Sequence, residues 1–169
     1  MNLKLSVPQP LIAAHLLNEF ECGEHTLDDW LKRRAMSNQL SGASRTFVVV
    51  DEERRVCGYY AMAAGAVSHQ LATSAVRRNM PDPVPVMVLG RLAVDRRVQG
   101  FKLGAAMLQD AVNRAIVVSQ NTGVRALLVH ALNDRAKQFY EFYGFQESPQ
   151  HSMTLMLRLI SVNTKEFDL

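Results

Sequence analysis

The feature that most limits the fold is a long helical pattern held between two short apolar segments. Apolar residues recur at three- and four-residue steps from Leu103 to Asn121, which predicts a helix that Thr122-Gly123 ends. The segments on either side, Val86 to Val94 and Val124 to Ala131, are almost continuously apolar and suit strands buried on both faces. A strand, a helix and a strand in this order form a crossover, so the sequence predicts a parallel strand pair.

The rest of the chain completes one domain. The other predicted elements are a helix over Thr26–Leu40 that Thr26 caps, a hairpin of strands at Arg45–Asp51 and Val56–Ser68, a helix over Asp134–Tyr143 capped by Asn133 or Asp134, and a last strand near Met153–Ile160. We therefore expect a single domain over residues 1–169, α+β with an α/β-like order, in which helices flank a mixed central sheet. Residues 161–169 are expected to form a loose polar tail.

The composition is that of a globular protein, with 48% hydrophobic and 21% charged residues, which excludes a disordered or fibrous chain. No apolar run approaches the ~20 residues that cross a bilayer, and the first residues lack a secretory signal pattern. We therefore expect a soluble, cytoplasmic protein with no membrane partner. Cys22 and Cys57 lack CxxC spacing, which excludes zinc-ribbon and thioredoxin-type sites and leaves a disulfide between them open.

The positive charge of the chain is concentrated in one segment. The formal net charge is +3, yet residues 77–102 alone hold six basic and two acidic side chains, or +4. The remaining residues hold 13 basic and 14 acidic side chains, or −1. This distribution indicates an anionic partner that meets a particular part of the surface.

The segment from Leu89 to Gly104 has the order of a phosphate-binding loop. A buried strand leads through a short basic loop with Gly100 into the start of the long helix, where free backbone N–H groups and the positive helix end meet. Arg96, Arg97 and Lys102 would add mobile positive charge. Taken alone, these residues fit an ordinary strand-to-helix turn with solvated basic side chains equally well.

A second segment, Val129 to Phe145, favours the phosphate-binding interpretation. It combines a strand, an asparagine turn and a helix, and its signature residues are Asn133, Ala136, Phe139, Tyr140, Gly144 and Phe145. Together with the preceding strand, loop and helix, it resembles the GNAT family of acetyl-CoA-dependent N-acetyltransferases over roughly residues 45 to 160. The resemblance implies a GNAT fold with a splayed parallel strand pair, acetyl-CoA as cosubstrate and no metal.

The pyrophosphate loop of the GNAT family usually reads Gln/Arg-x-x-Gly-x-Gly/Ala. Here Gln99 and Gly104 match the first and last positions, and Lys102 replaces the middle glycine. If the backbone at Lys102 has a positive φ, the lysine costs about 1 kcal/mol or more. If φ is helical, the lysine is harmless and could itself contact a coenzyme A phosphate, and we expect this second case.

The resemblance also implies the residues of the site. The strand Leu89–Val94 would carry a bulge that makes room for pantetheine, and Tyr140 would protonate the departing coenzyme A thiolate. The residues implied for acetyl-CoA binding are Leu92, Ala93, Val94, Arg97, Gln99, Gly100, Phe101, Lys102, Leu103, Gly104 and Asn133. Tyr59, Tyr60 and Tyr143 fit structural roles better, and we expect His130 to be a strand residue near the core rather than a general base.

Five segments extend the resemblance to the GNAT toxins of bacterial toxin–antitoxin modules. They are Leu27–Lys32, Ala43–Val49, Arg77–Val86, Arg91–Asp95 and Val129–Leu132. Such toxins acetylate the α-amine of aminoacyl-tRNA and thereby block translation. The basic residues that remain for this acceptor are Arg77, Arg78, Arg91, Lys32 and Arg33.

The same resemblance implies partners. They are a ribbon–helix–helix antitoxin, operator DNA bound through the antitoxin complex, and a second copy of the chain in a homodimer. Two alternatives stay open. An acetyltransferase for small amines or protein N-termini would show little salt dependence, whereas tRNA binding weakens steeply with salt. A non-catalytic binding module with the same fold is indicated only by Lys102.

Overall fold

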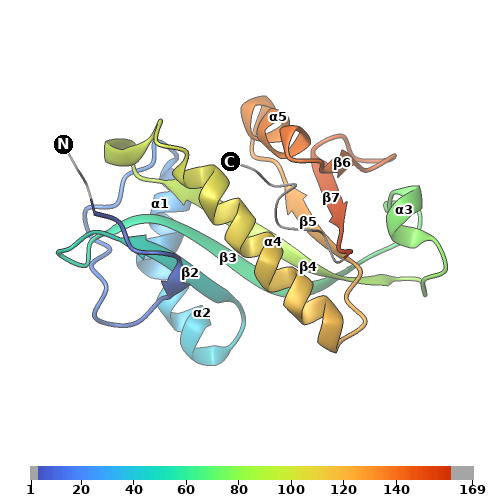
Figure 1. The fold of residues 1–169 in the computed structure, drawn as a ribbon, viewed down its shortest axis with the longest axis horizontal. Coiled ribbons are helices and arrows are strands. Elements are labelled where there is room, and N and C mark those ends of the chain that lie inside the picture. The colour runs from blue at the N-terminus through green and yellow to red at the C-terminus, as the bar shows by residue number, and fades with distance from the viewer. Residues whose placement is uncertain (1–3, 161–169) are drawn as a thin grey trace. The chain divides into compact units, whose positions relative to one another are not determined.

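The computed structural model describes residues 4–160. Its helices and strands, labelled in Figure 1, are β1 (Gln9–Pro10), α1 (His25–Arg33), α2 (Ala35–Ser41), β2 (Arg45–Val50), β3 (Val56–Val67), α3 (Ser74–Arg77), β4 (Val84–Val94), the 3-10 turn η1 (Arg96–Val98), α4 (Leu103–Asn121), β5 (Ala126–His130), α5 (Asp134–Phe142), β6 (Gln146–Glu147) and β7 (Thr154–Arg158). The strand order is β1-β2-β3-β4-β5-β7-β6. By their contacts the described residues form two compact units, one of residues 4–63 and 91–111 and the other of residues 64–90 and 112–160.

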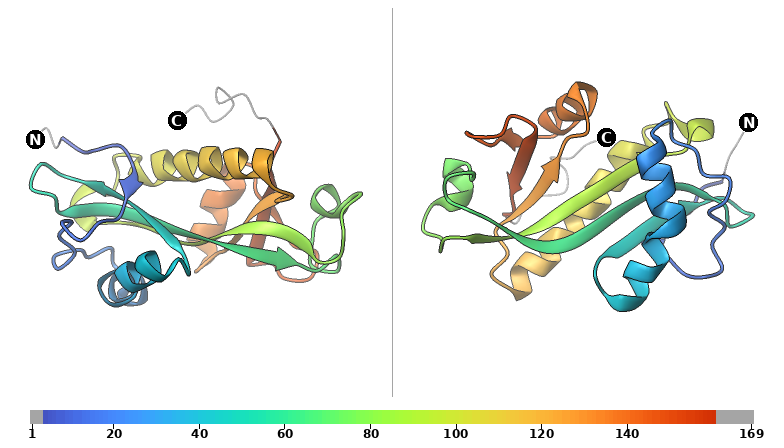
Figure 2. Two further views of the ribbon diagram at one scale, coloured as in Figure 1. Left: turned by 90° about the horizontal axis from the view of Figure 1, so that it is seen from below. Right: turned by 180° about the vertical axis from the view of Figure 1, so that it is seen from behind.

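The first unit is built on the antiparallel hairpin of β2 and β3. β2 is β-branched over most of its length, and its pairing with β3 runs from Arg45 opposite Met62 to a register shift at Val49/Val50. Helices α1 and α2 bury Leu31 and Ala35 against Val48 and Tyr59. Figure 2 shows α1 and α2 on the face of β2 and β3 opposite to the first turns of α4.

The other face of β3 receives the first turns of α4 because Gly58 has no side chain. A Cβ built at Gly58 would lie 2.9 Å from the end of the Met107 side chain and 3.2 Å from that of Leu103. Both distances are tighter than ordinary van der Waals contact. The glycine therefore permits the close approach of α4, whose predicted bounds, Leu103 to Asn121, are confirmed.

Two predictions for the first helical segment are wrong. The expected single helix over residues 26–40 is two helices that meet at Arg34, where φ is −119° and ψ is −31°. Thr26 does not cap α1, since the helix begins one residue earlier, at His25, and Glu24 precedes it without a side-chain cap. The end of α2 follows the expected chemistry, because Gly42 takes the left-handed conformation (φ 82°).

The second unit contains the predicted parallel pair. β4 runs parallel to β5 from Val86 opposite Ala126 to Leu89 opposite Val129, and β5 then pairs antiparallel with β7. β4 itself continues to Val94, five residues beyond the end of this register. The mixed sheet with its splayed parallel pair is therefore confirmed, and the bulge within Leu89–Val94 stays a prediction.

The elements that were not predicted are short. They are β1, β6, the turn η1 and the four-residue helix α3. The N-terminus of α3 is capped by Thr73, whose Oγ1 accepts a hydrogen bond from the Val76 N–H at 3.4 Å. The predicted loose tail, residues 161–169, lies outside the described residues. Within residues 4–160, no helix has the length and hydropathy that a bilayer span requires.

Candidate functional site

The loop between β4 and α4 belongs to the first unit and has an open glycine backbone. Gly100 takes a φ of 89°, and a Cβ built there would meet nothing within 4 Å. α4 begins at Leu103, so the first-turn N–H groups, which have no partner within the helix, follow this glycine directly. The positive end of the helix dipole adds to them, and the loop thus has the backbone that holds phosphate groups.

Asp95 is the residue that organises this loop. Its side chain is buried, and its Oδ1 accepts hydrogen bonds from the Arg97 N–H at 2.9 Å and from Arg97 Nε at 2.8 Å. Its Oδ2 accepts from Arg97 Nη2 and from the Glu21 N–H, each at 3.1 Å. Burial alone would raise the pKa of Asp95, but these hydrogen bonds outweigh it and hold the pKa below its ordinary value.

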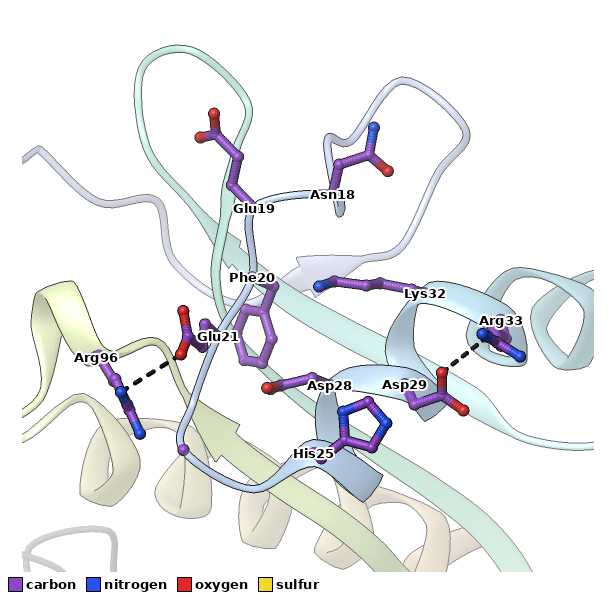
Figure 3. Close-up of a pocket in the computed structure, with 11 residues that line it drawn as sticks. Asn18, Glu19, Phe20, Glu21, His25, Asp28, Asp29, Lys32, Arg33 and Arg96 are labelled. Atoms are coloured by element: carbon purple, nitrogen blue, oxygen red, sulfur yellow. Dashed lines mark ion pairs between the residues drawn. The ribbon is translucent and has the colours of Figure 1, made fainter.

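Arg97 is therefore part of the frame of the loop rather than the mobile positive charge that we expected. Arg96 is also paired, because its Nη1 lies 3.4 Å from Glu21 Oε1 (Figure 3). The Gln99 side chain has a similar structural use. Its Nε2 donates to the carbonyl of Cys22 at 2.8 Å and to that of Val94 at 2.9 Å. Arg96 and Gln99 thus fasten the loop to the segment that precedes α1, and Asp95 does so through the Glu21 N–H.

The expectation of a helical φ at Lys102 is wrong. Lys102 takes a φ of 61°, in the left-handed region that glycine adopts without penalty. A residue with a Cβ costs about 1–2 kcal/mol in that conformation. The loop therefore has the backbone conformation that a glycine would favour at this position, and the lysine there is strained.

Tyr140 lies in the second unit, on α5, with 7% of its surface exposed. Its ring contacts Phe139 and Phe145, with centroids 5.3 and 5.4 Å away. Within residues 4–160 its hydroxyl has no hydrogen-bond partner. Burial raises the pKa of this hydroxyl above its ordinary value, so the group stays protonated at neutral pH. A protonated phenol without a competing partner is suited to donate a proton.

Asn133 and His130, which belong to the same sequence segment as Tyr140, form hydrogen-bonding contacts within the second unit. Asn133 caps α5 as predicted, with its Oδ1 accepting from the Ala136 N–H at 2.9 Å. His130 is exposed rather than near the core, and its Nδ1 lies 3.0 Å from Thr154 Oγ1. It is exposed because it is the last residue of β5. The role of a general base is not supported for it by any carboxylate partner within the described residues.

The predicted structural roles of Tyr59 and Tyr60 are confirmed. Both side chains are fully buried. The Tyr59 hydroxyl donates to the carbonyl of Leu27 at 2.6 Å, and the Tyr60 hydroxyl donates to the Asp110 carboxylate. Tyr143 packs edge-on against Phe139, with centroids 5.3 Å apart, which agrees with the structural role expected for it.

The five basic residues predicted for the acceptor fall into two groups. Arg77 and Arg78, in the second unit, end α3, and Arg77 Nη1 donates to the carbonyl of His69 at 3.3 Å. Arg91, Lys32 and Arg33 belong to the first unit. Arg33 is paired with Asp29 at 2.8 Å, and the Arg91 guanidinium lies over the Trp30 ring, 4.3 Å from its centroid.

Sequence reasoning missed a cavity beside α1, of about 770 Å³. Figure 3 shows the ion pairs Glu21–Arg96 and Asp29–Arg33 at its wall, and Lys32 reaching toward Phe20. Its residues come from α1, from the segment before it and from the loop after β4, so only a tertiary contact reveals it. Cys22 and Cys57 are both free cysteines, so they do not form a disulfide. Within the described residues, no three His, Cys, Asp or Glu side chains are placed to hold a metal ion.

Comparison with known proteins gives the family. A family model described as an acetyltransferase (GNAT) domain matches residues 43–147. The chain is 47% identical to the tRNA-acetylating toxin of Mycobacterium tuberculosis over 152 residues, which are 90% of this chain and 91% of that protein.

Solved structures agree. AtaT complexed with acetyl-methionyl-tRNAfMet is 27% identical and superposes with a TM-score of 0.83, over 93% of this chain and 95% of that one. A tyrosine-to-phenylalanine mutant of the AtaT toxin, bound to the C-terminus of the antitoxin AtaR and to acetyl-CoA, is also 27% identical. Its TM-score is 0.78, over 97% of this chain and 96% of that one.

Proposed function

The chain belongs to the GNAT acetyltransferases, in the group that includes the tRNA-acetylating toxin of Mycobacterium tuberculosis, and on this basis we propose that it transfers the acetyl group of acetyl-CoA to the α-amine of aminoacyl-tRNA. The acetylated product cannot take part in elongation, so the protein acts as a toxin of translation. The observation that carries the proposal is the 47% identity to that toxin over nine-tenths of both chains.

The loop after β4 supplies the groups that acetyl-CoA needs. The open backbone at Gly100 and the first-turn N–H groups of α4 receive the pyrophosphate, and Phe101, Lys102, Leu103 and Gly104 line the approach. Gln99 and Arg97 contribute by holding the loop in shape, because their side chains are bound to carbonyls and to Asp95. The strand residues Leu92, Ala93 and Val94 offer their backbone to pantetheine, since β4 continues beyond its register with β5. Asn133 acts through the start of α5, which it caps.

Tyr140 is the proposed proton donor. The neutral amine attacks the thioester carbonyl, and the C–S bond then breaks to release coenzyme A as a thiolate that takes the phenolic proton. The amine nitrogen loses one proton to solvent as the amide forms, and solvent returns a proton to the Tyr140 phenolate. Burial raises the pKa of Tyr140, so the hydroxyl carries its proton at neutral pH. The solved structure of a tyrosine-to-phenylalanine mutant of AtaT, bound to acetyl-CoA, supports the choice of a tyrosine hydroxyl as the group to test.

The acceptor needs no strong base. An α-amine has a pKa of about 7.7–8.0, and the adjacent ester lowers it further, so much of the amine is neutral at physiological pH. The basic residues Arg77, Arg78, Arg91, Lys32 and Arg33 suit the phosphates of tRNA and oppose a cationic small amine. This charge preference separates aminoacyl-tRNA from polyamines as acceptor.

The proposed partners follow from the relatives. We propose an antitoxin that covers this protein as AtaR binds AtaT, with a ribbon–helix–helix domain that attaches the complex to operator DNA. A homodimer would provide a longer positive surface for the tRNA stem. The cytoplasm, where charged tRNA is found, is the proposed place of action.

A matched pair of tyrosine variants tests the proposal. The wild-type protein, Tyr140→Phe and Tyr143→Phe are each incubated with labelled acetyl-CoA and total charged tRNA, and the tRNA is digested to nucleosides. We expect labelled N-acetyl-aminoacyl-adenosine from the wild type and from Tyr143→Phe, and a rate at least 100-fold lower, about what general acid catalysis supplies, from Tyr140→Phe. Equal rates for all three proteins would remove Tyr140 from the mechanism. Absence of label from every aminoacyl group would overturn the proposed function.

A further inference from the structure

Two of the segments that carry the toxin resemblance meet in the fold. Trp30 comes from α1 and Arg91 from β4, and the Arg91 guanidinium carbon lies 4.3 Å from the centroid of the Trp30 ring. At this distance a guanidinium packs against the negative face of an indole. The contact joins α1 to the C-terminal part of β4.

The ring of Trp30 is itself held in place. It stacks on Tyr59 with centroids 6.0 Å apart and an interplanar angle of 10°. Tyr59 is fully buried, its hydroxyl is bound to the Leu27 carbonyl of α1, and Phe20 meets its edge at 5.5 Å. Trp30 thus contacts both Arg91 and the buried Tyr59, and these three residues are hereafter called the Arg91 stack. Because Tyr59 holds Trp30 in place, Trp30 restricts the position of the Arg91 guanidinium.

No carboxylate within residues 4–160 pairs with the Arg91 guanidinium. Three nearby arginines are paired with carboxylates: Arg33 with Asp29, Arg96 with Glu21 and Arg97 with Asp95. Within residues 4–160, the Arg91 side chain has no ion pair and no hydrogen bond, and its guanidinium lies over the Trp30 ring. A guanidinium whose face rests on an aromatic ring keeps the N–H groups of its edge free. Those groups match the geometry of a phosphate, which accepts two parallel hydrogen bonds.

The position of Arg91 along β4 favours a ligand near the reacting groups. The register of β4 with β5 ends at Leu89, so Arg91 lies two residues beyond it and directly precedes Leu92, the first of the strand residues that we propose for pantetheine. It lies on the same face of β4 as Ala93, which packs with Tyr59 and Leu31 in the core under α1. A fixed cation here opposes a cationic acceptor and attracts an anionic one.

We infer that Trp30 is a positioning residue, which holds Arg91 in the orientation that binds a backbone phosphate at the acceptor end of aminoacyl-tRNA. This inference rests on the proposed function and deepens it. Arg91 touches the substrate, and Trp30 acts through Arg91. The Arg91 stack therefore selects a nucleic-acid acceptor, while the chemistry at the thioester is left to other groups.

Variants of both residues test the inference by steady-state kinetics with charged tRNA over a series of salt concentrations. The variants are Arg91→Gln, Arg91→Lys, Trp30→Leu, Trp30→Phe and the double variant Trp30→Leu/Arg91→Gln, and the control is Arg54→Gln, which removes an exposed arginine in the turn between β2 and β3. Each protein is also assayed for the KM of acetyl-CoA. Thermal unfolding identifies any variant that fails to fold. If Trp30→Leu or Arg91→Gln does not fold, the conservative variants Trp30→Phe and Arg91→Lys test the inference in its place.

We expect Arg91→Gln and Trp30→Leu to raise the KM for charged tRNA about tenfold, with a smaller effect on kcat, and to leave the KM for acetyl-CoA within about twofold. The slope of log(kcat/KM) against log[salt] should become shallower by about 0.7, the loss of one phosphate contact on a single strand. The double variant should be no worse than Arg91→Gln, since Trp30 acts through Arg91. Trp30→Phe keeps an aromatic ring face, so its KM for charged tRNA should stay within about threefold of the wild-type value. Arg91→Lys keeps the charge but loses the planar guanidinium, so its KM should be raised as in Arg91→Gln.

Unchanged KM and salt slope in Trp30→Leu, with active wild type, would overturn the inference and leave the proposed function intact. A purely structural role for Trp30 would instead raise both KM values together and add to the effect of Arg91→Gln. Wild-type protein that acetylates no charged tRNA would reject the proposed function itself, before any variant is compared.

Discussion

The buried carboxylate of Asp95 receives both Nε and Nη2 of Arg97, at 2.8 and 3.1 Å, and this fork holds the loop that precedes α4. The same carboxylate also accepts the Arg97 and Glu21 backbone N–H groups. One side chain thus joins the end of β4, the turn η1 and the segment before α1. The shape of the proposed pyrophosphate site depends on it.

Asp95→Asn tests that dependence. The amide keeps the size of the side chain but presents an N–H₂ group to donors, so at least one hydrogen bond to Arg97 is lost and a buried donor faces another. We expect the free energy of unfolding to fall by about 2 kcal/mol, less than the roughly 3–5 of a fully buried pair because Arg97 is partly exposed. The KM for acetyl-CoA should rise at the same time.

Asp29→Asn is the matched control, measured with Asp95→Asn by urea unfolding. Asp29 forms an exposed ion pair with Arg33, and such pairs contribute roughly 0–1 kcal/mol. If both variants lose the same small amount of stability, Asp95 does not organise the loop.

The contribution of Asp95 should depend on pH in a defined direction. Its pKa is lower in the folded protein than the value of about 3.9 in an unfolded chain, so its stabilisation is fully present above that pH. The stabilisation is lost as the pH falls through the folded-state pKa. Asp51, whose pKa is also lowered through its hydrogen bonds with Arg55 and Glu53 against the effect of burial, acts in the same sense.

Urea unfolding of wild type and Asp95→Asn at neutral pH and below about pH 4 measures this effect. The stability difference between the two proteins should shrink as the pH falls below about 4, because the carboxyl is protonated first in the unfolded chain and, at lower pH, in the folded protein. A difference that is constant across this range would show that the charge of Asp95 contributes nothing to stability.

Lys102→Gly should stabilise the protein. Glycine removes a left-handed penalty of about 1–2 kcal/mol and adds a cost of roughly 0.5–1 kcal/mol from the flexibility of the unfolded chain, so a net gain of roughly 0.5–1 kcal/mol is expected. Lys102→Ala separates shape from charge, because alanine keeps the strain and lacks the ammonium group. Thermal unfolding of the three proteins measures the gain, and equal gains for Gly and Ala would show that φ is not its source.

Gln99→Glu should weaken acetyl-CoA binding without changing the size of the side chain. The Gln99 amide N–H₂ group bonds two carbonyl oxygens, at 2.8 and 2.9 Å, and a carboxylate there would face both of them without a proton. We expect the KM for acetyl-CoA to rise about tenfold, the effect of losing roughly 1.4 kcal/mol. Gln138→Glu, an exposed change on α5, is the control, and equal KM values for the two variants would remove Gln99 from the frame of the loop.

The parts of the fold that could be predicted are those in which one local pattern dominates. The stripe of α4 and the stop after it set its bounds at Leu103 and Asn121, and the side chain of Asn133 identified the start of α5. β1 and β6 could not be predicted, because each is two residues long and exists only through pairing with β2 or β7. The prediction that Thr26 caps the first helix was wrong because Thr26 lies inside α1, which starts at His25.

The candidate site shows the same division. The motifs predicted the loop residues from Gln99 to Gly104, because their spacing is local. The φ of Lys102 could not be foreseen, since a lysine ordinarily avoids a left-handed backbone. The contacts Gln99–Cys22 and Arg91–Trp30 join segments that are distant in sequence, so they require the tertiary structure.

The proposed acceptor is the α-amine of aminoacyl-tRNA, and a competition between acceptors in one reaction tests this assignment. Wild-type protein receives labelled acetyl-CoA together with equal concentrations of charged tRNA, a polyamine and a peptide with a free N-terminus, and mass spectrometry assigns the label. We expect the label to be recovered as N-acetyl-aminoacyl-adenosine after digestion, and raising the salt concentration to suppress this labelling steeply. Label on the polyamine or the peptide, with none on the aminoacyl-adenosine, would contradict this assignment.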